Sequence, residues 1–443
     1  MSDSSALNHA ARIVALASRE QPADAVLRDY LVDPTRTRMA PAEKRAVVRT
    51  VFTYFRWLQW LEPRESLQRQ FSQALALQQR FDENPLSIKA EALAVRAVPP
   101  WLRDEMELPA DFLRQLQRDP VVWLRARPSA AEKLAAALGD CTPPSAASAA
   151  VQGSGFKAQS PPLAAPVPSD PQLPALNPFS AVASAKADQV PVLRPVRHSF
   201  SDGGSLGEGV SAIPLTALRY AGEKDLFRTP EFQAGAFEIQ DLASQFVGHA
   251  CAPQPGETWW DACAGAGGKT LHLADLMQNR GLVWASDRSA RRLTALKQRT
   301  ARAKIFNYRT ALWDGSARLP TKTKFDGILL DAPCSGVGTW QRNPHARWTT
   351  TPNDVSELAA IQLQLLNHAA SALKPGGRLI YSVCTLTRSE TTAVAEAFAT
   401  AHPELEPQPL FGSGSEAPSS QLTILPHEIN ANGMFIAGWK RRS

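Results

Sequence analysis

"TWWDACAGAGGKTLHLADLM", residues 258–277, decides the fold, because an apolar run, a glycine-rich turn and an apolar helical stretch follow one another directly. A strand that turns through glycines into a helix is the repeating unit of a parallel α/β sheet. We expect this sheet from about residue 235 onward, with function at the carboxyl ends of its strands. Further apparent strands, most of them separated by helical stretches, lie at 281–287, 307–315, 325–333 and 376–384.

The glycine-rich turn allows three interpretations. A P-loop needs a glycine five residues before Gly268, where this chain has Cys263. A dinucleotide fingerprint needs a third glycine at the position of Thr270. The third interpretation is the adenosylmethionine loop of a class I (Rossmann-like) methyltransferase, whose backbone passes close to the cofactor and so requires small residues. A lone glycine loop is often only a tight strand–helix turn, but acids follow the next two strands and favour a cofactor site.

The predicted cofactor contacts therefore extend beyond the turn. Asp287, at the end of the next strand, suits the ribose hydroxyls, and Asp314, after the third strand, suits the adenine. The full predicted set is Cys263, Ala264, Gly265, Ala266, Gly267, Gly268, Lys269, Asp287, Asp314 and Asp331.

The loop after the fourth strand narrows the reaction. Methyltransferases that act on exocyclic amines usually carry an aromatic side chain here, whereas this chain has Asp331-Ala332-Pro333-Cys334. A thiolate that adds to carbon 6 of cytosine makes carbon 5 nucleophilic enough to take a methyl group, which is covalent catalysis. A base must then remove the carbon 5 proton, and no residue is assigned to that step.

Four long segments carry a resemblance to a known family. "DACAGAGGKT", "LLDAPCSGVGTWQRNPHARW", "LKPGGRLIYSVCTLTRSE" and "TILPHEINANGMFIAGWKRR", with "GAFEIQDLASQ" before them, resemble the Nop/Sun family of RNA cytosine-5 methyltransferases, bacterial ribosomal-RNA (RsmB-like) type. The resemblance covers about residues 210–443. It implies an adenosylmethionine-dependent enzyme acting on a single-stranded or flipped-out cytidine in RNA, most simply ribosomal RNA.

The resemblance also implies roles for individual residues. Cys384 matches the nucleophile, Cys334 the cysteine that helps release the product, and Asp331 the acid that holds the base beside the cofactor. Arg342 and Arg347 would lie near the RNA, although a surface role is equally open. Departures from the family pattern are Gly265-Ala266-Gly267 in the cofactor loop, Val383 before the nucleophile and Thr391 after Glu390.

Two further domains are predicted before the catalytic one (235–443). Residues 1–118 are an all-α domain resembling the NusB-like RNA-binding domain, with Val48, Val51, Phe52 and Phe55 on the buried face of a helix and Lys44, Arg45, Arg49 and Arg56 mostly elsewhere. Residues 119–234 are a small α+β subdomain, interrupted at about 141–190 by a Pro/Ala/Ser-rich insertion that we expect to be disordered.

Composition restricts the possible partners and the cellular compartment of the protein. The formal net charge of +6 fits a mildly basic surface or a polyanionic partner. Five cysteines without a CxxC pair argue against a disulfide framework and a zinc ribbon and favour a cytoplasmic protein. We expect no transmembrane helix, secretory signal, membrane association or metal site, and we expect a monomer.

Several alternatives remain open at this stage. The same chemistry could act on transfer RNA, or the chain could be a non-catalytic RNA-binding factor with a degenerate methyltransferase domain. A DNA enzyme would use the cysteine after the fourth strand and leave Cys384 idle. His272 and His345 could be bases, on no more than their neighbourhood.

Overall fold

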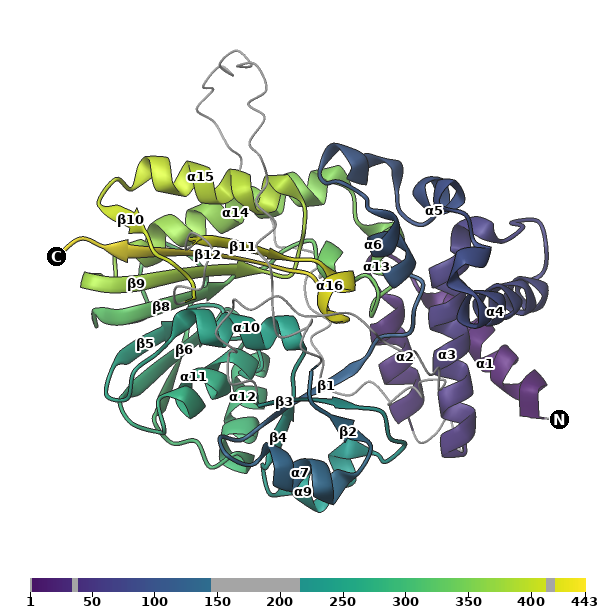
Figure 1. Ribbon diagram of the computed structural model, residues 1–443, viewed down its shortest axis with the longest axis horizontal. Coiled ribbons are helices and arrows are strands. Elements are labelled where there is room, and N and C mark those ends of the chain that lie inside the picture. Colours follow the sequence, from purple (N-terminus) through teal and green to yellow (C-terminus); the bar gives the residue numbers. More distant parts are fainter. Residues whose placement is uncertain (1, 34–38, 145–215, 412–418) are drawn as a thin grey trace, which may run out of the picture.

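The computed structural model describes residues 2–33, 39–144, 216–411 and 419–443. The chain forms a helical domain, a small sheet and a large sheet, seen in Figure 1 at the right, bottom and left. The predicted insertion falls mostly outside the described residues. Its first two positions, Cys141 and Thr142, form a short strand instead, so the interruption begins later than predicted.

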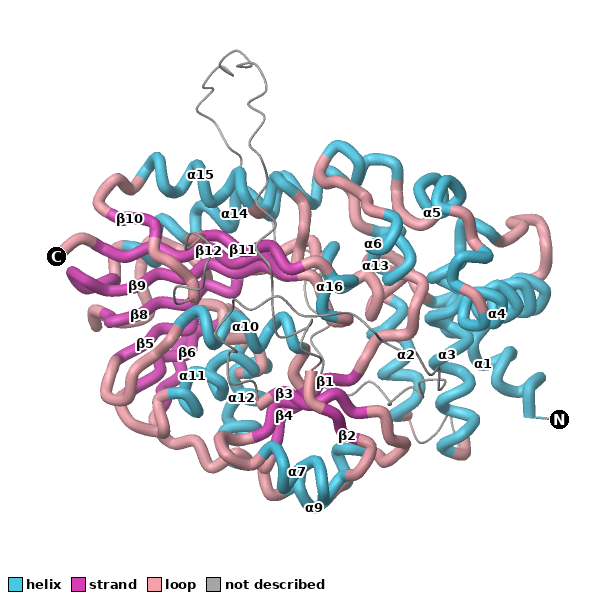
Figure 2. Tube along the Cα trace, in the orientation of Figure 1, coloured by secondary structure: helices cyan, strands magenta, loops and turns pink. Residues whose placement is uncertain are grey.

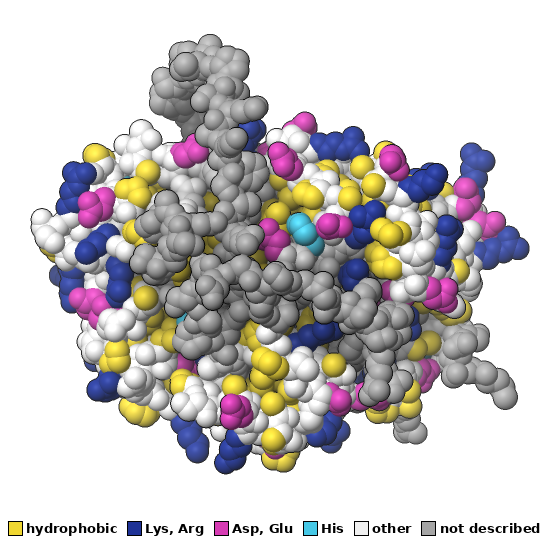
Figure 3. Space-filling model, viewed as in Figure 1, with side chains coloured by type: hydrophobic (Ala, Val, Ile, Leu, Met, Phe, Trp, Pro, Cys, Tyr) yellow, Lys and Arg dark blue, Asp and Glu magenta, His cyan; other side chains and the backbone are white. Residues whose placement is uncertain are grey.

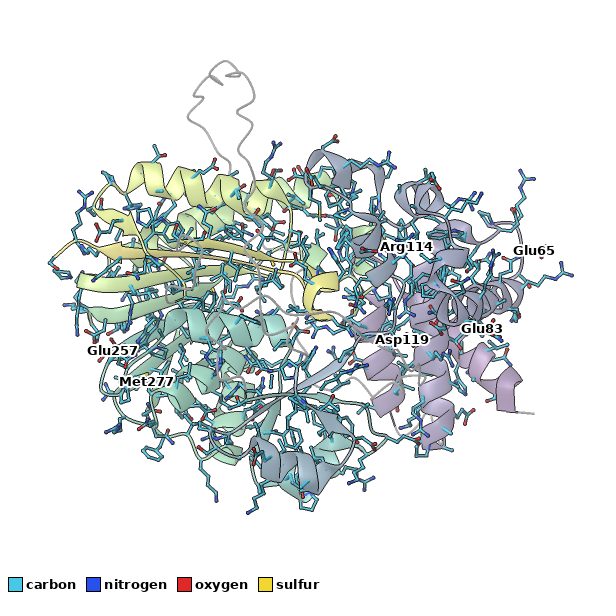
Figure 4. The ribbon with its side chains drawn as sticks, in the orientation of Figure 1. Glu65, Glu83, Arg114, Asp119, Glu257 and Met277 are labelled. Atoms are coloured by element: carbon cyan, nitrogen blue, oxygen red, sulfur yellow. The ribbon has the colours of Figure 1, made fainter. Side chains whose placement is uncertain are left out.

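The helical domain is built on α3 (Pro41–Trp57). Pro41 occupies the first turn, and Val48, Val51, Phe52 and Phe55 are all buried, which confirms the predicted apolar face. Arg56 departs from the expectation of a solvated face or an RNA contact, because it is 1% exposed and pairs with Asp119 at 2.7 Å. Asp119, labelled in Figure 4, lies in the connection from the helical domain to the small sheet. The other helices are α1 (Ser2–Leu16), α2 (Ala23–Val32), η1 (Leu58–Trp60), α4 (Leu67–Glu83), η2 (Pro85–Ser87), α5 (Ala90–Arg96), η3 (Pro100–Asp104) and α6 (Ala110–Gln115).

The core of the helical domain continues into the catalytic domain. Val337, Trp340 and Leu386 are buried members of the same apolar cluster as α1–α6. Trp340 packs edge-to-face on Trp101 of η3, with ring centroids 6.1 Å apart. The two domains therefore share one apolar core at their contact.

The small sheet has strand order β2-β3-β1-β4 and is antiparallel. Its last strand, β4 (Phe237–Ile239), pairs with β1 (Val122–Ala126) although it lies beyond residue 235. The boundary predicted at residue 235 therefore falls before the last strand of this sheet. The remaining elements are α7 (Ala131–Leu138), β2 (Cys141–Thr142), β3 (Ala217–Tyr220), η4 (Leu226–Arg228) and α9 (Pro230–Gln233).

The large sheet has strand order β10-β12-β9-β8-β5-β6-β7, with β11 paired to β12. The predicted strands β5 (Thr258–Asp261), β6 (Leu282–Asp287), β7 (Tyr308–Leu312), β8 (Phe325–Asp331) and β9 (Leu373–Val383) are parallel. The antiparallel strands β10 (Leu405–Pro407), β11 (Gln421–Ile424) and β12 (Met434–Arg441) extend the sheet beyond β9 and were not predicted.

Helices cover both faces of the large sheet, as Figure 2 shows. Successive strand residues point to opposite faces, so Trp259 packs in the cluster with α10 and α11, while Trp260 packs in the cluster with α14 and α15. The helices are α10 (Leu242–Cys251), α11 (Gly268–Leu276), α12 (Ala290–Arg302), η5 (Val337–Thr339), α13 (Ala346–Thr349), α14 (Pro352–Ala370), η6 (Arg388–Glu390), α15 (Thr392–Ala401) and α16 (Pro426–Ile429).

Candidate active site

The predicted site residues gather at the carboxyl ends of the parallel strands. β5, β6 and β8 each end on an aspartate, namely Asp261, Asp287 and Asp331. β9 ends at Val383, one residue before Cys384, and its Ser382 lies in register with Asp331. Parallel register therefore brings the cofactor loop and both cysteine loops to one edge of the sheet.

The glycine loop takes a conformation that its residue types permit. Gly265 and Gly267 have φ of +56° and +91°, in the left-handed region that favours glycine. A Cβ at Gly267 would lie 2.6 Å from Cγ of Leu296, so α12 packs too closely for any side chain there. The loop and the start of α11 are fixed against the next helix.

Asp287 closes this loop from the next strand. Its Oδ2 accepts the N–H of Gly265 at 3.0 Å, and its Oδ1 accepts the N–H of Ser289 at 2.8 Å. Asp261, which was not predicted as a site residue, is fully buried and accepts the Thr270 hydroxyl at 2.6 Å. Asp261 holds the end of β5 to the first turn of α11.

Lys269 and Asp331 join the cofactor loop to the cysteine loops. Lys269 Nζ lies 2.8 Å from Asp331 Oδ2, and both side chains are about nine-tenths buried. The Ser382 hydroxyl donates to Asp331 Oδ1 at 3.1 Å. Asp331 therefore stands between the glycine loop and the strand that leads to Cys384.

The two cysteines are neighbours in space. The Sγ atoms of Cys334 and Cys384 are 3.4 Å apart, although the residues are 50 positions apart in the chain. Cys334 is buried and Cys384 is partly exposed. The hydrogen bond to the Cys384 sulfur, burial and the nearby negative charges raise the pKa of the Cys334 thiol well above its usual range. The neutral thiol form of Cys334 is therefore favoured over its thiolate.

Asp314 and Cys263 lie at the margins of the site. Asp314 follows β7 at the same end of the sheet, and hydrogen bonds from Ser316 lower the pKa of its exposed carboxylate. Cys263 is partly buried in the cofactor loop and packs against the cluster around Trp260. The structure thus places Asp314 within the carboxyl-end edge as an accessible acceptor.

The structure corrects the prediction that Arg347 lies near the RNA. It is fully buried between the helical and catalytic domains. Its guanidinium donates to the carbonyl oxygens of Ala97 at 2.9 Å and Leu116 at 3.0 Å. Both the predicted position near the RNA and the alternative surface position are therefore wrong for Arg347, whereas Arg342 is partly exposed and its RNA contact stays a prediction.

His345 and His272, the two histidines considered as possible bases, are surrounded by packing contacts. His345 Nδ1 lies 3.3 Å from the backbone N–H of Ala23, and its ring packs on Phe55. His272 is buried between α10 and α11, where a Cβ at Gly248 would lie 2.1 Å from its Nδ1. Burial lowers the pKa of His345 to about 4 and that of His272 well below its usual value.

Within the described ranges of the chain, no group of three or more His, Cys, Asp and Glu side chains is placed to hold a metal ion. Within the same ranges, every helix is too short or too polar to cross a bilayer. On the face in Figure 3, Lys and Arg side chains of the described residues are spread over both domains among acidic ones.

The family described as 16S rRNA methyltransferase RsmB/F matches residues 249–440. This match runs from the end of α10 to β12. The matched range contains the glycine loop, both cysteines and the Lys269–Asp331 pair. The resemblance to RsmB-like members of the Nop/Sun family is thereby confirmed.

Curated relatives agree with the RsmB/F match. The chain is 37% identical over 234 residues to "Probable ribosomal RNA small subunit methyltransferase B" of Synechocystis sp., covering 51% of this chain and 52% of the relative. It is 30% identical over 272 residues to the Vibrio vulnificus "Ribosomal RNA small subunit methyltransferase B", covering 58% and 62%. The chain thus spans about half to three-fifths of the length of these relatives.

The solved structure called PH0851 shares the fold. It superposes with a TM-score of 0.59 at 22% identity, covering 95% of this chain and 82% of that one. The predicted fold class, a Rossmann-like methyltransferase domain preceded by a helical domain, is confirmed.

Proposed function

We propose that this chain transfers a methyl group from S-adenosylmethionine to carbon 5 of a cytidine in small-subunit ribosomal RNA. The observation that carries the proposal is the pair of sulfurs 3.4 Å apart at the ends of β8 and β9, beside the Lys269–Asp331 pair. A thiolate nucleophile with a second thiol in contact suits addition to a pyrimidine ring followed by release.

The donor set of the glycine loop fits adenosylmethionine. Gly265 and Gly267 turn the backbone without side chains, leaving room for a close approach of the ligand. Asp287 uses one lone pair on each oxygen for the loop, and a carboxylate has further lone pairs for ribose hydroxyls. Asp314 would meet the adenine, and the bound group would supply an electrophilic methyl.

The cysteines and Asp331 would carry the reaction on the base. The Cys384 thiolate would add to carbon 6, the electron pair of the carbon 5–carbon 6 bond would move to carbon 5, and carbon 5 would take the methyl group with release of S-adenosylhomocysteine. Asp331, fixed by Lys269 and Ser382, would hold the cytosine edge. Removal of the carbon 5 proton restores the double bond and expels Cys384, and we propose that Cys334 assists this release.

The choice of ribosomal RNA rests on the relatives' names, which specify ribosomal RNA small subunit methyltransferases B and F. The helical domain is proposed to contribute RNA binding, as in the NusB-like resemblance. Since the chain spans only part of those relatives, substrate and partners belong to the proposal.

The experiment is methyl transfer from labelled adenosylmethionine to unmodified small-subunit rRNA, bulk tRNA and duplex DNA. Label at carbon 5 of cytidine in rRNA, lost in Cys384→Ala, is the expected result. Label in tRNA or DNA alone would replace the proposed substrate. Binding of adenosylmethionine without transfer to any of the three would favour the non-catalytic alternative.

A further inference from the structure

Glu390 is a carboxylate buried under the two cysteine loops. Its side chain is fully buried, and five donors converge on its two oxygens. Oε1 accepts the Ser335 N–H at 2.8 Å and Gln362 Nε2 at 2.9 Å. Oε2 accepts the Thr387 hydroxyl at 2.8 Å, the Thr385 hydroxyl at 3.2 Å and the Ser335 hydroxyl. Each of these groups can donate, which favours the ionised carboxylate, whereas burial opposes it and raises the pKa of Glu390.

These donors come from both cysteine loops. Ser335 directly follows Cys334, and Thr385 directly follows Cys384. The two hydroxyls are also 2.8 Å from each other. One carboxylate therefore ties together the backbone immediately after each sulfur, and a shift of either loop would break at least one of these bonds.

α14 and β9 complete the arrangement. Gln362 of α14 donates both to Glu390 and to the carbonyl oxygen of Pro333 at 2.8 Å, on the other side of Cys334. The Tyr381 hydroxyl lies 2.7 Å from the carbonyl oxygen of Glu390 and 2.9 Å from Gln362 Oε1. Cys334 is thus held from both flanking residues by groups that depend on Glu390.

We propose that Glu390 is a positioning residue that clamps the Cys334 loop to the Cys384 loop and fixes the distance between the two sulfurs. Glu390 touches no reacting atom in this arrangement. It acts through Ser335, Thr385 and Gln362, so that the release partner stands in contact with the nucleophile. This inference rests on the proposed function and assigns a residue that the proposed chemistry itself does not require.

The charge of Glu390 has a second effect. A carboxylate this close to Cys334 opposes loss of the thiol proton, because two negative charges would then share a buried site. Glu390 is among the groups that raise the pKa of Cys334, after the Cys384 hydrogen bond and burial. The clamp therefore keeps Cys334 as a thiol while it holds it in place.

Two substitutions separate the reach of Glu390 from its charge. Glu390→Gln keeps the length and removes the charge, and the three surrounding hydroxyls can rotate to accept from the new amide. Glu390→Asp keeps the charge and shortens the reach, so the carboxylate cannot bridge both loops. Glu396→Gln, an exposed glutamate on α15, makes the same change of charge outside the clamp.

Two readouts are measured on the full chain. In methyl transfer, kcat should fall about 100-fold in Glu390→Asp and about 10-fold in Glu390→Gln, with the KM for adenosylmethionine unchanged. In the Cys384→Ala background, alkylation of Cys334 by iodoacetamide, followed by peptide mass spectrometry, should begin roughly one pH unit lower with Glu390→Gln. Glu390→Asp should leave that pH profile in place, and Glu396→Gln should change neither readout.

Wild-type kcat in both Glu390 variants would overturn the proposal. If either variant fails to fold, Ser335→Ala decides, because it keeps the carboxylate and removes a side-chain link from the Cys334 loop; unchanged kcat there would also overturn it. The alkylation of Cys334 can be measured without RNA, so the two proposals can fail separately. Absence of methylation by the wild type would count against the proposed function. An alkylation profile that Glu390→Gln does not shift would count against the clamp.

Discussion

The two halves of the site are held by different kinds of interaction. The cofactor half is fixed by ion pairs from the small sheet: Arg125 and Arg127 of the β1 segment pair with Asp275 of α11, and Glu238 of β4 pairs with Arg299 and Arg302 of α12. The cysteine half is fixed by the helical domain through Trp340, Leu386, Arg347 and Glu105, largely with apolar packing and hydrogen bonds to backbone groups.

The difference shows that neither half of the site is built by the large sheet alone. Arg299 also donates to the carbonyl oxygen of Ala266, so an ion pair of the small sheet reaches the cofactor loop directly. Glu105 accepts the N–H and the hydroxyl of Ser389, at 2.9 and 2.7 Å, just before Glu390. Damage to one accessory domain should therefore affect one half of the site and spare the other.

The largest effect is expected for Arg347→Met. Removing the guanidinium leaves the buried carbonyl oxygens of Ala97 and Leu116 without donors, and such losses cost about 3–5 kcal/mol in total. Urea denaturation should show an earlier midpoint, and methyl transfer should fall with it. Arg96→Met, an exposed arginine on α5 next to Ala97, is the control and should lie within about 0.5 kcal/mol of wild type.

Glu238→Gln tests the cofactor half. Burial opposes the ionised form of Glu238, but the charges of Arg299 and Arg302 outweigh it and lower its pKa. Losing the carboxylate removes the shared counter-charge of two partly buried guanidinium groups, at a cost of about 2–4 kcal/mol. Adenosylmethionine affinity, measured by calorimetry, should fall about 10-fold. Site-resolved alkylation of the cysteines should be unchanged, and an equal change there would contradict the separation of the two halves.

Acid should loosen the contact of the helical domain. Folded His345 has a pKa of about 4, whereas an unfolded histidine titrates near 6.5. The unfolded chain therefore binds the proton first, and stability present above about pH 6.5 is lost as the pH falls towards 4. At pH 5 the cost is about 1–2 kcal/mol.

His345→Asn isolates this contribution, because an amide oxygen can accept from Ala23 without titrating. Thermal unfolding of the variant should lose less between pH 7 and pH 5 than that of the wild type. Identical losses would assign the acid sensitivity to other groups, among them His249, whose pKa burial also lowers to about 4.

Glu105→Gln should give the smallest effect. An amide oxygen can still accept one of the two hydrogen bonds from Ser389, so about 1 kcal/mol is expected from the lost bond. The kcat should fall a few-fold, by about the same energy, with adenosylmethionine affinity unchanged. A loss of cofactor affinity larger than the loss of kcat would break the assignment of Glu105 to the cysteine half.

The parallel strands and the site edge could be predicted from the sequence because each strand ends on a distinctive residue next to a local turn. Asp261, Asp287, Asp331 and Cys384 all lie within a residue or two of a strand end. β4 was assigned to the wrong side of a boundary because its partner, β1, lies more than a hundred positions earlier.

The errors concern side chains whose partners are distant in the sequence. Arg347 stands in a polar stretch of sequence, and its burial is explained by the carbonyl groups of Ala97 and Leu116, more than 200 positions away. In the sequence, Glu390 was noted only because Thr391, the residue after it, departs from the family pattern. Its five donors come from three segments, a convergence that local pattern cannot reveal.

The division of labour between Cys384 and Cys334 is tested most directly by trapping the protein–RNA adduct. Wild type, Cys334→Ala and Cys384→Ala are incubated with adenosylmethionine and unmodified small-subunit rRNA, and the products are separated on a denaturing gel. We predict a stable adduct with Cys334→Ala only, because Cys384 can attack but is not released. A stable adduct with Cys384→Ala instead would make Cys334 the nucleophile and contradict the roles assigned to the two cysteines.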